Sequence, residues 1–142
     1  MSEQAAAYIS PELDNLTCEL IGVCLDALAE DGQTPPTIAC LSTEGEASWR
    51  TFSEDGPDAA LAAARRTIRR ERSDIRAYAI AYDGFIRQDA RSQPVDALLV
   101  EFAERGMPTA YSAYVAYRKG DTPDQFTVSD PLAAGEEPNL LV

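Results

Sequence analysis

Residues 77–86, AYAIAYDGFI, decide the fold of this chain. Small and large side chains alternate along residues 77–82, and strict alternation predicts a β-strand. Asp83-Gly84 then precedes Phe85-Ile86, and an Asp-Gly pair in this setting predicts a two-residue hairpin turn. Residues 95–103 predict another long strand, and residues 109–118 alternate again. We therefore predict a three-stranded antiparallel meander.

The same alternation predicts two sheet faces that differ in side-chain size. If the strands pair as we assume, the bulky face collects Tyr78, Ile80, Tyr82, Tyr111, Val115 and Tyr117. The opposite face collects Ala77, Ala79, Ala81, Ala110 and Ala116. Neither set is polar, so we expect both faces to be covered.

Two helices are predicted before the meander. Ser10-Pro11 is a typical helix start and Asp31-Gly32 a typical end, which predicts a leucine-rich helix over residues 11–31. Gly56-Pro57 begins an alanine-rich helix that runs to about residue 72. We expect the alanine-rich helix to cover the small face. The leucine-rich helix, or a second subunit, then covers the tyrosine face.

Between the helices, residues 38–41 and 48–52 flank Glu44-Gly45-Glu46, which indicates a hairpin. The whole pattern predicts an α+β fold in the order α-β-β-α-β-β-β, with two helices packed on a mainly antiparallel sheet of about five strands. Residues 1–142 are expected to form a single domain, with residues 120–142 as an extended tail packed on or beside it. Within that tail, residues 125–128 favour a short edge strand.

This order of elements resembles, in topology alone, the roadblock and profilin-like group of small α+β domains. The resemblance implies an adaptor that often forms dimers. We expect self-association through the tyrosine-bearing side of the sheet or its adjoining edge, because tyrosine is common at interfaces.

Charge is distributed unevenly along the chain, whose formal net charge is −12. Residues 1–64 carry 12 acidic side chains and one basic side chain, Arg50, whereas residues 65–119 carry 11 basic and seven acidic ones. An acidic protein repels nucleic acid and anionic membranes at long range, so we expect neither as a partner. With no apolar run of ~18–20 residues and no signal-peptide pattern after Met1, we expect a cytoplasmic protein.

Arginines form one basic island in the second helix and just after it. The arginines at residues 65, 66, 69 and 70 fan over one sector of the helix. That sector either neutralises the acidic N-terminal half or binds an anionic ligand or an acidic partner. With the tyrosines, the candidate binding residues are Arg65, Arg66, Arg69, Arg70, Tyr78, Tyr82, Tyr111 and Tyr117.

Several kinds of chemistry are excluded by what the sequence lacks. It contains no histidine, and Cys18, Cys24 and Cys40 are not spaced as zinc ligands, so we predict no metal site. Neither common nucleotide-phosphate motif occurs, and no catalytic residue or cofactor is predicted. We expect a non-enzymatic protein-binding module, an adaptor or an immunity-like inhibitor, whose acidic surface binds a basic partner. The alternative is an anionic-ligand-binding protein, or a histidine-free enzyme, that uses the arginine sector.

Overall fold

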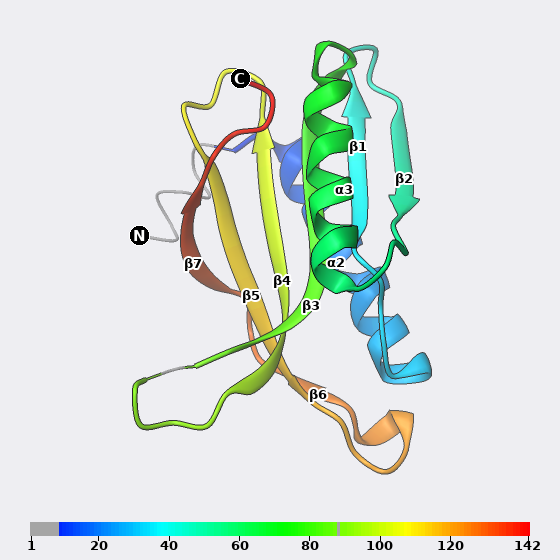
Figure 1. Cartoon of the computed structure of the whole chain (residues 1–142), viewed down its shortest axis with the longest axis vertical. Coiled ribbons are helices and arrows are strands. Elements are labelled where there is room, and N and C mark those ends of the chain that lie inside the picture. The colour runs from blue at the N-terminus through cyan, green and yellow to red at the C-terminus, as the bar shows by residue number, and fades with distance from the viewer. Residues whose placement is uncertain (1–8, 88) are drawn as a thin grey trace.

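Two α-helices and a seven-stranded antiparallel sheet form the computed structural model, which describes residues 9–87 and 89–142 (Figure 1). The helices are α2 (Pro11–Asp31) and α3 (Pro57–Arg70). The strands are β1 (Thr37–Ser42), β2 (Ala47–Thr51), β3 (Ile75–Ile86), β4 (Val95–Glu104), β5 (Ala110–Arg118), β6 (Thr127–Val128) and β7 (Leu132–Glu137). The α+β class and the two helices are confirmed, but the sheet has seven strands rather than about five. No helix of this described part is long and apolar enough to cross a membrane.

The main sheet runs in the order β2-β1-β3-β4-β5, and both β6 and β7 pair with β5. Both extra strands come from residues 120–142. Strand β7 was missed because Leu132–Glu137 contains Gly135 and lies between two prolines, so its sequence alone does not favour a strand. Its pairing with β5 supplies the backbone hydrogen bonds that hold it extended.

Both helices begin where their capping residues predict, and α2 also ends there. The Ser10 hydroxyl accepts a hydrogen bond from the Leu13 N–H at 3.1 Å, and Pro11 occupies the first turn of α2. Gly32 ends α2 with a left-handed φ of 78°, which a glycine adopts without a Cβ clash. Helix α3 ends at Arg70, about two residues earlier than expected.

The two helices lie on opposite faces of the sheet, but with the assignment reversed (Figure 1). Leucines of α2 pack over Ala39, Ala79 and Ala81, whereas alanines of α3 pack over Tyr78 and Ile80. The physical reason is complementary size. Leucine side chains fill the space above small residues, whereas the bulky side chains of the other face leave room only for a helix whose facing side chains are alanines. The expectation that alanines meet alanines is therefore wrong.

The tyrosines do not share one face, so the single tyrosine face is also wrong. Phe102 pairs with Tyr111 and Leu98 pairs with Val115, which places Tyr111, Val115 and Tyr117 on the α2 face. Tyr78, Ile80 and Tyr82 lie on the α3 face. A shift of one residue in register exchanges the two faces of a whole strand. The register of β5 differs from the assumed one by such a shift.

Asp83-Gly84 is not a turn, because β3 continues through both residues to Ile86. Gly84 has no left-handed φ, which the predicted turn type requires at both central residues. Its role is a close approach instead, since a Cβ at this position would lie 2.9 Å from Leu99 Cδ1. The chain reverses only beyond Ile86, and β4 begins at Val95.

The residues that follow β7 close one end of the core beside α3. Leu140 and Leu141 are buried in the same cluster as Tyr78, and the Leu140 N–H donates to the Tyr78 hydroxyl at 3.2 Å. The Asn139 side-chain amide donates to the backbone oxygens of Glu104 at 3.2 Å and Met107 at 2.9 Å. This segment therefore docks on its own chain.

Candidate functional site

The arginine sector of α3 is divided between two sides of the helix. Arg65 points to the sheet and pairs with Glu101 of β4, whereas Arg70 lies 3.7 Å from Glu71 near the opposite side. Arg66, Arg69 and Arg70 are exposed. None of the ion pairs in the described chain joins an arginine to an acidic side chain of residues 9–64. Neutralisation of the acidic half by these arginines is therefore not observed.

Glu101 is the centre of a buried polar network on the α3 face. Arg65 reaches both carboxylate oxygens, its Nε lying 3.3 Å from Oε1. The Tyr82 hydroxyl donates to Oε2 at 3.0 Å, and the Arg65 guanidinium lies 6.0 Å from the Tyr82 ring centroid. Burial, reinforced by the Glu101 carboxylate, raises the pKa of Tyr82. A carboxylate so fully occupied holds α3 on the sheet and is poorly placed to exchange protons with a substrate.

The other predicted tyrosines are occupied inside the fold. Tyr78 is fully buried, and burial raises its pKa to about 12. The Tyr117 hydroxyl donates to Asp83 at 2.5 Å, and its ring stacks on Phe126 at 5.4 Å. Burial and the bond to Asp83 raise the pKa of Tyr117. Tyr111 is half-buried beside Phe102, so of the four only Tyr82 lines a cleft.

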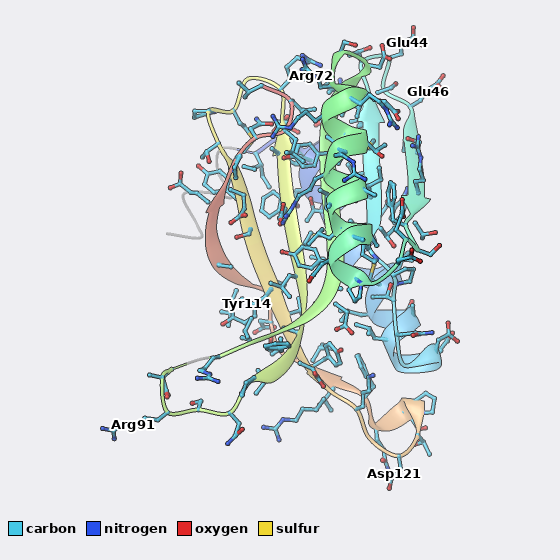
Figure 2. All side chains as sticks on the ribbon, viewed as in Figure 1. Glu44, Glu46, Arg72, Arg91, Tyr114 and Asp121 are labelled. Atoms are coloured by element: carbon cyan, nitrogen blue, oxygen red, sulfur yellow. The ribbon has the colours of Figure 1, made fainter. Side chains whose placement is uncertain are left out.

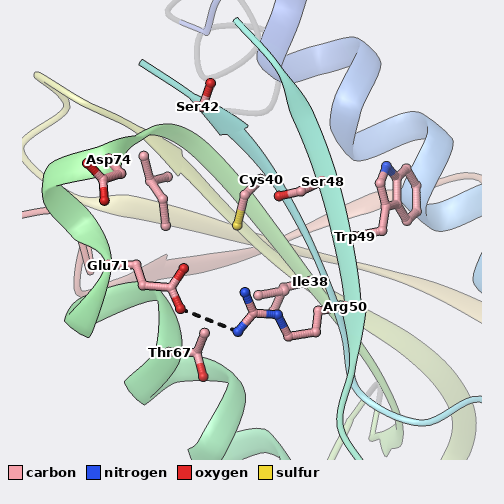
Figure 3. A pocket seen from close by; sticks show the side chains of 10 residues that line it. Ile38, Cys40, Ser42, Ser48, Trp49, Arg50, Thr67, Glu71 and Asp74 are labelled. Carbon is pink, nitrogen blue, oxygen red and sulfur yellow. Dashed lines mark hydrogen bonds and ion pairs between the residues drawn. The ribbon is translucent and has the colours of Figure 1, made fainter. Parts of the chain in front are cut away.

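A small cavity of about 140 Å³ lies between β1, β2 and the end of α3 (Figure 3). The Cys40 thiol points into it beside the ion pair of Arg50 and Glu71, whose nearest atoms are 3.3 Å apart. Burial raises the pKa of Cys40 to about 11. The thiol therefore stays protonated near neutral pH and is a poor nucleophile.

The larger cleft, about 900 Å³, opens where β3 runs past the start of α3. Its walls come from three parts of the chain: residues 33–36, residues 52–61 and residues 82–85, with Leu99 beneath them. Apolar lining comes from Pro36, Phe52, Leu61 and Leu99. Glu54 and Asp58 add carboxylates, and no basic side chain lines the cleft in the part of the chain that the structure describes. Asp83 also lines the cleft, but its carboxylate accepts the hydrogen bond from Tyr117. Such a cleft suits a group that is both apolar and positively charged.

Sequence reasoning missed this cleft because its walls are far apart in the chain. The available signal was Pro35-Pro36 directly before β1, since proline cannot donate to a β-ladder and so limits the strand. Within residues 9–87 and 89–142 no three metal-ligating side chains come together.

Helix α2 adds a second acidic surface. Its six acidic side chains are all exposed, and no basic residue occurs within the helix. Glu30 and Asp31 stand in the last turn, where the helix dipole disfavours negative charge. Val23, 55% exposed, lies on the same helix. Glu30 and Asp31 therefore do not stabilise the helix, whereas Glu12 and Asp14 in its first turn do.

Comparison with known proteins finds no matching family model, no matching curated protein and no matching solved structure. The resemblance to roadblock and profilin-like domains stays a prediction.

Proposed function

We propose that this chain is a non-catalytic protein-binding domain, an adaptor or an inhibitor, whose acidic surface binds a basic partner. One observation carries the proposal. Eleven acidic side chains between residues 12 and 58 are exposed, and none forms an ion pair within residues 9–87 and 89–142. They are Glu12, Asp14, Glu19, Asp26, Glu30, Asp31, Glu44, Glu46, Glu54, Asp55 and Asp58.

Unpaired charge of one sign has consequences for binding. It raises the rate of encounter with a partner of opposite charge and disfavours partners of the same charge. The cleft adds apolar surface next to two of these carboxylates, Glu54 and Asp58. Charge that steers and apolar surface that excludes water are together typical of a protein-binding site.

The alternative function, an anionic-ligand-binding protein or a histidine-free enzyme that uses the arginine sector, is less well supported. Arg65 is already paired with Glu101, and the exposed Arg66, Arg69 and Arg70 line neither of the two cavities described above. An anionic ligand would find no enclosed basic site there.

The test is affinity capture from the source cell at about 50 mM salt, identification of bound proteins by mass spectrometry, and measurement of Kd with the purified partner. Two variants lose the same charge at opposite ends of helix α3. Glu54→Gln with Asp58→Asn changes the cleft, and Glu44→Gln with Glu46→Gln changes the hairpin turn, where Figure 2 shows both glutamates far from the start of α3.

We expect a basic partner whose Kd rises at least tenfold with the cleft variant and less than twofold with the turn variant, because Glu44 and Glu46 lie outside the cleft and contribute only to long-range attraction. Equal weakening by both variants would mean nonspecific attraction to net charge. Capture of no basic protein by the wild-type chain would also contradict the proposal.

A further inference from the structure

Strand β3 extends past its neighbour β1. The pairing of β1 with β3 ends at Thr37 and Ala81, whereas the pairing with β4 continues from Tyr82 and Leu99 to Ile86 and Val95. Residues 82–86 of β3 therefore have a strand on one side only. The chain before β1 does not fill the other side as a strand, because Pro35 and Pro36 cannot donate to a ladder.

The alternation of backbone hydrogen bonds shows which groups face this open side. The Arg105 N–H donates to the Arg76 oxygen at 2.8 Å, so even-numbered residues of β3 bond toward β4. Odd-numbered residues bond toward β1, as far as Ala81. Asp83 and Phe85 come next in that series. Their N–H and C=O groups thus point to the open side, where the described chain places no hydrogen-bond partner for them.

The open edge and the acidic cleft are the same place. Tyr82, Asp83, Gly84 and Phe85 form one wall of the cleft, and residues 33–36 and 52–58 form the others. Phe85 is 70% exposed although it lies within a strand. Five residues of strand span about 16 Å, and the next strand of a sheet would lie about 4.8 Å away. A cleft of about 900 Å³ holds a peptide of this length.

We propose that residues 82–86 bind an extended segment of the basic partner as an added β-strand. The inference rests on the proposed function and names the binding mode. Backbone groups of Asp83 and Phe85 supply up to four hydrogen bonds, and the occupant carries basic side chains that approach Glu54 and Asp58. Charge complementarity selects a basic segment, since carboxylates are the only charged groups that line the cleft in the described chain.

The experiment begins with selection from a displayed library of random twelve-residue peptides against the intact chain. The selected peptides are then titrated into three variants. Phe85→Pro removes the outward N–H without disturbing the ladder to β4, because that N–H faces the open side. Phe85→Ala removes the same side chain and keeps the N–H. Glu54→Gln with Asp58→Asn removes charge from the cleft, and melting temperatures confirm that each variant folds.

We expect enrichment of basic, β-branched peptides whose Kd rises at least tenfold in Phe85→Pro relative to Phe85→Ala. N-methylation of every second peptide nitrogen should abolish binding when the methylated nitrogens face β3 and should have little effect when the other set is methylated. Amide exchange at Asp83 and Phe85 should slow on binding. Equal binding to the proline and alanine variants, with loss in the charge variant, would overturn strand addition while the proposed function stands. Equal binding to all three variants would overturn both strand addition and the proposed role of the cleft in binding. A selection that enriches no peptide would overturn strand addition.

Discussion

Glu101 is the only buried charged residue in the part of the chain that the structure describes. Its carboxylate is 5% exposed and accepts hydrogen bonds from Arg65 and Tyr82. Glu101→Gln removes the negative charge and places the NH₂ group of the glutamine next to the hydrogen-bond donors of Arg65 and Tyr82. We expect the free energy of unfolding to fall by about 2 kcal/mol.

The matched control is Glu71→Gln, which breaks the exposed pairs with Arg50 and Arg70 and should cost less than about 1 kcal/mol. Urea unfolding of both variants checks the difference. Equal costs would mean that the Glu101 network contributes no more than a surface ion pair.

Tyr78 predicts how stability responds to alkaline pH. Its pKa is raised to about 12 by burial, above the value of about 10 of an unfolded tyrosine. The folded state therefore holds this proton more tightly, and the stability that follows is present below pH 10 and is lost as pH rises toward 12. Unfolding in urea between pH 9 and pH 12 should show this loss. Tyr78→Phe should show a smaller loss over the same range, and an unchanged slope would contradict the assignment.

Among the elements, β3 allows an experiment that distinguishes a strand from a turn at Asp83-Gly84. If Asp83-Gly84 were a turn with left-handed φ, Gly84→Ala would be strongly destabilising. In the strand, the new Cβ meets only the end of the Leu99 side chain, and the reduced freedom of the unfolded chain offsets part of the strain. We expect a change within about 1 kcal/mol.

Gly45, in the β1–β2 turn with φ 89°, provides the comparison. Gly45→Ala should cost about 1–2 kcal/mol because an alanine is strained in this conformation. Chemical denaturation measures both, and a larger cost at Gly84 than at Gly45 would refute the strand.

Helices were predictable from the sequence because their signals are local. Ser10-Pro11 and Gly32 act on the residues next to them, and α2 has the predicted limits. Sheet faces depend on register, which no local signal fixes, so Tyr111 and Tyr117 were placed on the wrong side. Strand β7 depends on β5 in the same way. The acidic character of the candidate surface was predictable from charge along the chain, but the cleft was not, because it exists only once Pro36, Leu61 and Asp83 come together.

Self-association of the whole molecule stays a prediction. The surface that we now expect to mediate it is an outer edge of the sheet and not a face that bears tyrosines. Helices cover both faces of the central strands, which leaves the outer edges of the sheet. All five residues of the edge strand β2 are exposed, including Trp49 at 39%. An exposed edge strand pairs readily with a second copy.

Sedimentation at micromolar concentration in about 150 mM salt should show a species near twice 15.4 kDa. Trp49→Lys should return it to the single mass, whereas Val23→Lys on α2 should not. A single species of 15.4 kDa for the wild-type chain would contradict the prediction.

The docking of Leu140 and Leu141 beside Tyr78 has a consequence for the order of folding. Their contact surface is built jointly by α3 and by the β3–β5 meander, so it exists only after those parts have assembled. Contacts that form after the transition state affect unfolding and leave folding rates unchanged. Leu140→Ala, which should cost about 2–3 kcal/mol, should therefore accelerate unfolding in stopped-flow experiments and leave the refolding rate nearly constant. Slower refolding would place this segment in the folding nucleus instead.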